Sequence, residues 1–457
     1  MSLTSHFDPA RIHARLDDLL PGSTPVLLGY SGGGDSHALL LIAAEWARAR
    51  KRDLHAVIVD HGLREESASE AQTARHAAAQ LGVTAHIRNC PIYTGDGSGI
   101  QAWARTHRHA CLERVARDVG AHQVLLGHTA DDQAETAWMR LIAGAGHRGL
   151  AAMGENDSFP LADASDDLRI IRPLLGVRRQ DLRNWLGAQI AQWVDDPSNE
   201  DRRYTRIRTR QTLSRLERAG LSIEDLTRLS TQCRALKMAT SEIAARAFLS
   251  IAVIASWGGV KLNVDRFGML PRPVGLQALE AAIACVTGAR DPLRRQGVEA
   301  LRDGLVSGDP ATGAGAVLVS YRSEVWLVRD PGAVLGRAGE NPLRDLDLAP
   351  NATAFWDKRF EVQSAAEHRA SITSLGRLAA DSVPTDTDLG PIPPLARKTL
   401  PVIHKDGTIL AIPGIKSHAR ITIAHMGAQL ARRCLFAGQA PAWFDHALHE
   451  SGFLGSQ

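Results

Sequence analysis

The chain has 457 residues, of which 44% are hydrophobic and 23% charged, so two or three globular domains are expected. A formal net charge of +3 does not indicate nucleic-acid binding, which only local basic clusters could support. The five cysteines are scattered without a Cys-x-x-Cys pair. This argues against a zinc ribbon, a redox motif or a disulfide framework. No apolar signal core or membrane-length apolar run is found, so we expect a cytoplasmic protein that does not contact a membrane.

The first 142 residues alternate apolar strands with amphipathic helices. A helix is expected at residues 8–20, behind the start signal Asp8-Pro9. Further strands are expected at 25–28, 54–60, 83–87 and 124–127, and further helices from 38, at 66–81, at 99–119 and at 131–142. This rhythm predicts a parallel sheet with helices on both faces. Because ligands bind at the carboxyl ends of such strands, the segments after Tyr30, Asp60 and Gly127 should share one crevice.

The first of these segments is the glycine-rich stretch Ser31-Gly32-Gly33-Gly34-Asp35-Ser36. Consecutive glycines let the backbone adopt positive φ angles and approach a ligand closely. The following helix start favours an anion, for which phosphate is the obvious choice. Asp35 would repel phosphate unless a cation lies between them, which points to Mg²⁺. The alternative is a simple glycine turn with Asp35 or Ser36 as a helix N-cap.

Two further clusters flank this stretch in the expected fold. Asp132 and Glu135 share one face of the helix after the fourth strand, where two carboxylates could hold a metal or a cationic substrate. The alternative is a capping box at a helix N-terminus. Arg105 and Arg108 share a face of the preceding helix, for which the alternative is a solvated basic stripe.

The middle of the chain contains an arginine-dense run. Its arginines are Arg202, Arg203, Arg206, Arg208 and Arg210. Such a run can bind nucleic-acid phosphates in a salt-sensitive way. The alternative is a solvated helix face with the acidic neighbours Glu200 and Asp201. Ahead of this run, a loop or surface hairpin is expected at 156–167 and a helix at about 179–191.

The remainder changes texture twice. Residues 222–306 are largely helical by period, with a break at Gly258-Gly259. Residues 331–352 are rich in glycine, proline and charge and are expected to be a linker. Short strands follow, with a hairpin turn expected at Asp406-Gly407. The expected domains are therefore 1–215, 216–330 and 353–457, with 331–352 between the last two.

Together these motifs resemble the N-type ATP pyrophosphatase (PP-loop) superfamily, and within it the tRNA(Ile)-lysidine synthetase family. The matching motifs within residues 24–212 are Ser31–Ser36, Asp60–Arg64, Ala104-Arg105 with Arg108, His128–Thr136, Gly149-Leu150 with Met153, Arg172–Leu175 and Asp196–Asn199. A weaker match lies at 400–402 and 412–415. The chain departs from the family pattern at His109, Ala143, Ala145 and Ile207.

The resemblance implies an α/β PP-loop fold, followed by a mainly helical domain and a small β-rich α+β domain. It implies a ligase that uses ATP to adenylate C2 of the wobble cytidine in a CAU-anticodon isoleucine tRNA. The ε-amine of L-lysine then displaces AMP and forms lysidine, which switches decoding from AUG to AUA. A homodimer is also implied. The alternatives are another PP-loop tRNA-modifying enzyme, such as a thiolase, and a non-catalytic tRNA-binding protein.

The resemblance also gives roles to individual residues. Asp35 and Asp132 are the expected catalytic residues and Mg²⁺ ligands. ATP is expected to bind Ser31, Gly32, Gly33, Gly34, Asp35, Ser36, Asp60 and His61. Lysine is expected to bind Arg108, His128, Asp132 and Glu135. The tRNA is expected to bind the arginine run, Arg202, Arg203, Arg206, Arg208 and Arg210, and the later domains.

Overall fold

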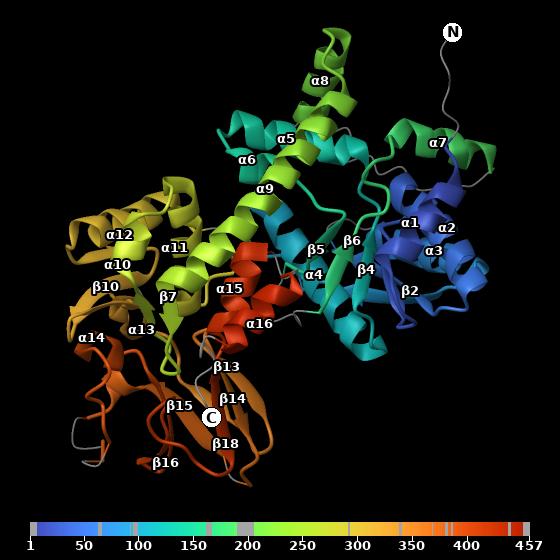
Figure 1. The fold of residues 1–457 in the computed structure, drawn as a ribbon. Coiled ribbons are helices and arrows are strands. Elements are labelled where there is room, and N and C mark those ends of the chain that lie inside the picture. Colours follow the sequence, from blue (N-terminus) through green and yellow to red (C-terminus); the bar gives the residue numbers. More distant parts are fainter. Residues whose placement is uncertain are drawn as a thin grey trace. The chain divides into compact units, whose positions relative to one another are not determined.

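The protein forms two compact units, residues 1–237 and 238–457, which we describe separately (Figure 1). The computed structural model describes residues 7–62, 66–91, 93–94, 99–160, 167–189, 205–290, 293–337, 341–367, 369–379, 383–384, 387–436 and 440–450. Arg202, Arg203 and the motif at 196–199 lie outside these residues.

The first unit is built on a six-stranded sheet in the order β3-β2-β1-β4-β6-β5. The strands are β1 (Val26–Gly29), β2 (Leu54–Asp60), β3 (Thr84–Asn89), β4 (Gln123–Leu126), β5 (Asn156–Ser158) and β6 (Arg169–Ile171). All neighbouring strands are parallel except the edge strand β5, which is antiparallel to β6. The chain winds from β1 through β2 to β3 in one direction and then crosses to β4 on the other side of β1. The strand order therefore reverses between β1 and β4, which is where open α/β sheets bind ligands.

Helices cover both faces of this sheet (Figure 1). The helices of the first unit are α1 (Pro9–Leu19), α2 (Gly34–Arg50), α3 (Ser67–Gln80), α4 (Ile100–Val119), α5 (Ala130–Ile142), α6 (His147–Leu150), α7 (Arg179–Ala188), α8 (Thr205–Arg218) and the start of α9 (Ile223–Ile251). Alternate residues of β1 pack into different cores, because side chains of a strand point to opposite faces. Leu28 packs in the core formed with α1, α2, α3 and α7, whereas Leu27 packs in the core formed with α4. The predicted parallel sheet with helices on both faces is confirmed.

Several element boundaries follow the sequence pattern closely. Strand β2 has the predicted bounds, and α4 ends at Val119 as predicted, before Gly120, which adopts a left-handed conformation. Helix α5 begins one residue earlier than predicted, at Ala130. The expected loop or hairpin at 156–167 contributes β5, which pairs with β6.

The second unit combines helices with three antiparallel sheets. Its sheet orders are β7-β8-β11-β10-β9, β12-β15-β16-β17 and β13-β14-β18. The strands are β7 (Ala252–Ile254), β8 (Val260–Leu262), β9 (Ala311–Gly313), β10 (Ala316–Tyr321), β11 (Glu324–Arg329), β12 (Leu346–Leu348), β13 (Thr353–Trp356), β14 (Phe360–Ser364), β15 (Ala370–Ser374), β16 (Pro401–Lys405), β17 (Thr408–Ala411) and β18 (Ile421–His425). The helices are the end of α9, α10 (Val264–Gly268), α11 (Arg272–Thr287), α12 (Arg295–Ser307), α13 (Pro331–Leu335), the 3₁₀ turn η2 (Leu375–Arg377), α14 (Pro394–Arg397), α15 (Gly427–Phe436) and α16 (Ala442–Glu450).

Two sequence predictions for this unit, a hairpin and a linker, can be compared with the structure. Asp406 and Gly407 both have positive φ angles and join antiparallel β16 and β17, so the predicted hairpin is confirmed. The segment expected to be a linker contains α13 and β12, and β12 pairs with β15. Within the described residues, no helix is both long and apolar enough to cross a membrane.

The core of the first unit makes a stability prediction. Leu28 is completely buried, so Leu28→Ala should leave a cavity and lower the free energy of unfolding by about 2–5 kcal/mol. Ile142→Ala is the control, because Ile142 is 65% exposed and its loss should change stability by at most about 0.5 kcal/mol. Urea denaturation followed by fluorescence measures both. Equal shifts in the two variants would contradict the assigned core.

Candidate active site

The glycine-rich stretch forms a tight turn between β1 and α2. Gly32 has a φ of +81°, which favours glycine, and Gly33 is the N-cap of α2. The Ser36 hydroxyl donates to the Gly33 carbonyl oxygen at 2.9 Å and accepts from the Ser31 backbone N–H at 3.3 Å. The loop is thus closed on itself at a helix start, where free N–H groups and the helix dipole favour phosphate.

The end of β4 lies against the start of α2. A Cβ atom added at Gly127 would stand 3.0 Å from the Asp35 carbonyl oxygen and 3.1 Å from the Ser36 Cα. Only glycine fits this position without displacing the loop. The two segments on either side of the reversal point therefore come together, as predicted from the strand ends.

An arginine that the sequence interpretation missed joins the predicted acids. Arg179, the first residue of α7, donates from Nε to Asp35 Oδ2 and from Nη2 to Asp132 Oδ1, each at 2.8 Å. Its Nη1 atom lies 3.6 Å from Glu135 Oε1. We call Asp35, Asp132 and Glu135 the acid cluster. One guanidinium group contacts all three members.

Asp132 divides its two oxygens between two tasks. Its Oδ2 accepts from the backbone N–H and the hydroxyl of Thr129, both at 2.9 Å, and completes a capping box at the start of α5. Its Oδ1 is the atom that faces Arg179. The capping box is thus formed by Thr129 and Asp132, not by Asp132 and Glu135 as the alternative supposed, and it leaves one oxygen of Asp132 for Arg179.

Glu135 is the most deeply buried member, with 1% of its surface exposed. Its Oε1 accepts from Arg210 Nε at 2.6 Å. Its Oε2 is buried and has no hydrogen-bond partner among the described residues. Buried polar atoms are rarely left without a partner, so this oxygen marks a place for a further donor.

The members of the acid cluster differ in acidity. Burial raises the pKa of Asp35, and the charge of Asp132 adds to that effect. Burial and the charge of Asp132 likewise raise the pKa of Glu135. Burial also opposes ionisation of Asp132, but Arg179 and the hydrogen bonds from Thr129 outweigh it and lower the pKa of this residue. Asp132 is thus held as the firmest anion of the three.

Asp60 and His61, which were predicted to bind ATP, lie at the end of β2, and His61 contacts Arg108 of α4. His61 accepts at Nε2 from Arg108 Nη2 at 3.5 Å, which leaves Nδ1 to donate to Cys90 Sγ at 3.3 Å. Burial and the charge of Arg108 lower the pKa of His61 to about 4, so its imidazole is neutral at pH 7. Asp60 accepts at Oδ1 from the Gly62 backbone N–H at 2.8 Å and shapes the turn after β2.

His128 is also a neutral imidazole. Arg172 Nε donates to its Nδ1 at 3.2 Å, which places the imidazole proton on Nε2. Burial and the charge of Arg172 lower its pKa to about 4. Arg172 is itself buried and paired with Asp157 at 2.7 Å. A neutral His128 would not repel a cationic ligand of the acid cluster.

The described arginines of the expected RNA-binding run differ in their surroundings. Arg210 contacts Glu135 and thus belongs to the acid cluster's surroundings. Arg206 is half-buried, and its charge acts on Arg105 and Arg108 of α4. Arg208 is exposed. The like charges of Arg105, Arg108 and Arg206 make a positive region suited to an anion.

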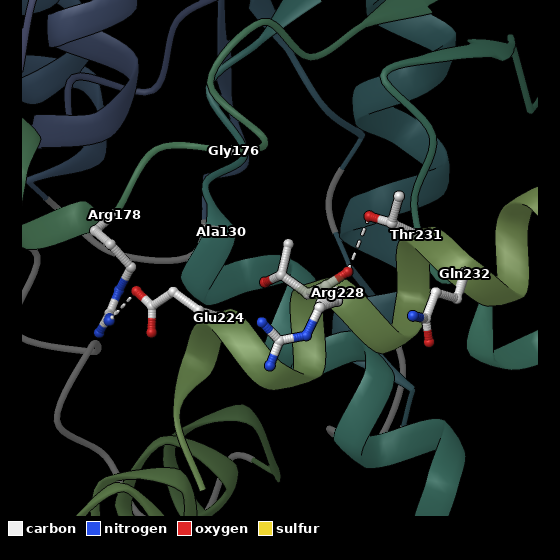
Figure 2. Close-up of a pocket in the computed structure, with 8 residues that line it drawn as sticks. Ala130, Gly176, Arg178, Glu224, Arg228, Thr231 and Gln232 are labelled. Carbon is white, nitrogen blue, oxygen red and sulfur yellow. Dashed lines mark hydrogen bonds and ion pairs between the residues drawn. The ribbon is translucent and has the colours of Figure 1, made fainter.

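A cavity of about 380 Å³ lies between the start of α5 and the start of α9 (Figure 2). It is lined by Ala130, Gly176, Arg178, Glu224, Thr227, Arg228, Thr231 and Gln232. Arg178 donates to Glu224 at 2.8 Å and to Glu217 at 3.1 Å. These ion pairs fix the chain immediately before Arg179.

Two departures from the family pattern lie in the protein interior. Ile207 is 7% exposed. His109 is 5% exposed and packs edge-on against Phe159, with the ring centroids 5.5 Å apart. Burial and the charge of Arg105 lower the pKa of His109 to about 3.

His109 makes a prediction about pH. In the unfolded chain His109 binds a proton below its ordinary pKa of 6.5, whereas in the folded protein its pKa is about 3. Between these two pH values the unfolded state binds more protons than the folded state, so acidification favours unfolding. The urea midpoint of the wild type should therefore fall between pH 7 and pH 5, and it should fall less in His109→Gln. Exposed His76→Gln serves as the control and should keep the wild-type fall. An unchanged pH dependence in His109→Gln would contradict a buried, neutral imidazole.

The comparisons with known proteins agree with this geometry. Residues 9–217 match the family model described as a PP-loop domain. A tRNA(Ile)-lysidine synthase of Hyphomonas neptunium is 34% identical over 326 residues, covering 71% of this chain and 86% of that protein. One of Caulobacter vibrioides is 33% identical over 404 residues, covering 86% and 88%. One of Rhodopseudomonas palustris is 41% identical over 214 residues, covering 45% and 58%.

The first two of these alignments extend over most of both chains. The chain belongs to the tRNA(Ile)-lysidine synthase family.

Proposed function

We propose that this protein ligates L-lysine to C2 of the wobble cytidine in an isoleucine tRNA with a CAU anticodon, at the expense of ATP. The reaction runs through an adenylated cytidine and yields lysidine, AMP and diphosphate. Family membership supports the reaction. The cytoplasm, where ATP and tRNA are present, is the proposed location, and the homodimer is carried over from the family resemblance alone.

The observation that carries the proposal is the junction at Asp35. This residue belongs to the phosphate loop, yet one guanidinium joins it to Asp132 and Glu135. A nucleotide site and a site for a cation therefore adjoin each other. An enzyme that activates a base with ATP and then attacks it with the amine of lysine needs this arrangement, because the two reactants must meet at one carbon.

In the first step the loop residues Ser31–Ser36 would hold the phosphates of ATP through backbone N–H groups. Asp35 and Asp132 fit Mg²⁺, because their oxygens converge on one guanidinium and Mg²⁺ is commonly held by one or two carboxylates with phosphate oxygens. The described residues contain no group of three or more potential metal ligands, so phosphate oxygens would complete the shell. A bound Mg²⁺ supplies neutralisation of charge on the departing diphosphate.

The cytidine must leave the base stack for its C2 oxygen to reach the α-phosphate. Arg206 and Arg208 on α8 are suited to contact the tRNA backbone nearby. The bond from the C2 oxygen to phosphorus forms while the bond to diphosphate breaks. The oxygen of C2 is thereby converted into part of a good leaving group.

In the second step Asp132 and Glu135 would bind the ε-ammonium group of lysine, and Arg108 would bind its carboxylate. The ammonium group must lose a proton before its nitrogen can attack. Glu135 is suited to accept that proton, because burial raises its pKa. The new bond from nitrogen to C2 forms, and AMP leaves with the oxygen.

The chemistry of the cysteines favours the ligase over a thiolase. Thiolation requires a reactive sulfur, and the thiolate is the reactive form. Burial and the nearby Cys111 raise the pKa of Cys90, which contacts His61, to about 11, so it is a thiol at pH 7. Cys111 itself is buried. A non-catalytic tRNA-binding protein would have no use for the costly buried acids of the cluster.

Incubation with ATP, labelled lysine and CAU-anticodon isoleucine tRNA tests the proposal. The wild type should incorporate lysine at the wobble cytidine and release one diphosphate per lysidine, and methionine tRNA should stay unlabelled. Asp35→Asn should form no detectable lysidine, because the metal and phosphate contacts are lost, while it retains tRNA binding in a gel-shift assay. Lysidine formation by this variant at the wild-type rate would contradict a role of Asp35 in binding the metal and the phosphates.

The lysine site makes a separate prediction. Glu135→Gln removes a charge that would bind the ammonium group, so the KM for lysine should rise at least about tenfold while the KM for ATP changes little. Glu45→Gln, at an exposed position of α2, is the matched control and should behave as the wild type. Equal increases in both KM values would contradict a lysine-binding role for Glu135.

A further inference from the structure

The acid cluster already holds a cation that belongs to the protein itself. The guanidinium of Arg179 lies 2.8 Å from Asp35 and Asp132 and 3.6 Å from Glu135. The side chain is largely buried, with 16% of its surface exposed. A guanidinium group is not deprotonated in proteins, so this cation is permanent. A side chain of the protein itself therefore occupies the seat, by which we mean the proposed binding site for the ε-ammonium group of lysine.

The seat is nevertheless incompletely satisfied. Glu135 Oε2 is buried and lacks a hydrogen-bond donor among the described residues. The planar guanidinium presents its donors in one fixed fork, whereas an ammonium group has three donors that can rotate to separate acceptors. An ammonium group could thus satisfy an oxygen that Arg179 leaves bare.

The backbone at the start of α7 is held by contacts that do not involve the Arg179 guanidinium. The backbone N–H of Arg179 donates to Asp131 Oδ2 at 2.7 Å, and the preceding Arg178 is held by Glu217 and Glu224. These contacts involve neither the Arg179 guanidinium nor the acid cluster. Rotation about the side-chain bonds would therefore vacate the seat while α7 stays in place.

We propose that Arg179 is an internal placeholder for the substrate's cation: its guanidinium occupies the acid cluster when lysine is absent, and lysine must displace it to bind. This inference rests on the proposed function. The placeholder keeps three neighbouring carboxylates from repelling one another in the empty site, and it makes each lysine molecule compete with a tethered arginine. Arg179 thereby sets the affinity for lysine and discriminates against weaker cations.

Calorimetric titration of L-lysine into the full-length protein without ATP or tRNA tests this competition. Arg179→Gln should bind lysine at least about fivefold more tightly than the wild type, because the competitor is gone. L-norleucine, which has no ε-ammonium group on its side chain, should bind both proteins equally. Arg183→Gln, one turn further along α7, is the electrostatic control, because the charge of Arg183 also acts on Asp35.

Thermal unfolding provides the second measurement. Without ligand, Arg179→Gln should melt below the wild type, and added lysine should raise its melting temperature more than that of the wild type. Arg179→Lys retains the charge, so it should stay close to the wild type in both measurements and serves if the glutamine variant does not fold.

Unchanged or weaker lysine binding by Arg179→Gln would overturn the proposal, as would an equal gain in Arg183→Gln or a matching gain in norleucine affinity. Binding of L-lysine by Arg179→Lys as tight as that of Arg179→Gln would overturn it as well, because the positive charge that competes with the ligand is retained in the Lys variant. Failure of the wild type to form lysidine would instead refute the proposed function, and the lysidine assay detects that independently of lysine affinity.

Discussion

The site depends on one electrostatic constraint, which is that three carboxylates lie close together at the reversal point of the sheet. Asp35 comes from α2, and Asp132 and Glu135 come from α5. Such a group is tolerable inside a protein only with compensating positive charge. Arg179 from α7 and Arg210 from α8 supply it. Four helices of the first unit are thus joined by these ion pairs.

This constraint links the glycine positions to the charged ones. Gly127 lets the end of β4 approach the backbone of Asp35, and Gly32 lets the loop turn back toward Ser36. Together they bring the start of α2 and the start of α5 close enough for their acids to share one cation. A side chain at Gly127 would push the end of β4 away from the start of α2, and a side chain at Gly32 would strain the positive φ angle of the loop.

Much of this site is readable from the sequence, because it rests on local rules. Strand periodicity and glycine stops locate the sheet, and the strand-end rule brings the loop after β1 and the segment after β4 to one edge. Arg179 follows the strand β6, whose end lies at the same edge, so the rule applied to β6 would have found it. Arg210 was expected at RNA because no local pattern reveals a partner 75 residues away. Tertiary ion pairs of this kind depend on the docking of α8 on α5, not on spacing.

The two oxygens of Asp132 have a consequence for how relatives of this protein are compared. Because one oxygen caps α5, a descendant that lost its activity would still gain from keeping this aspartate. Glu135 differs from Asp132 in this respect, because its buried oxygen without a hydrogen-bond partner lowers the stability of the fold when no ligand is bound. Drift in an inactive lineage would therefore erase Glu135 before Asp132. Among distant homologues, a glutamate at the position of Glu135 is therefore a better indicator of enzymatic activity than an aspartate at the position of Asp132.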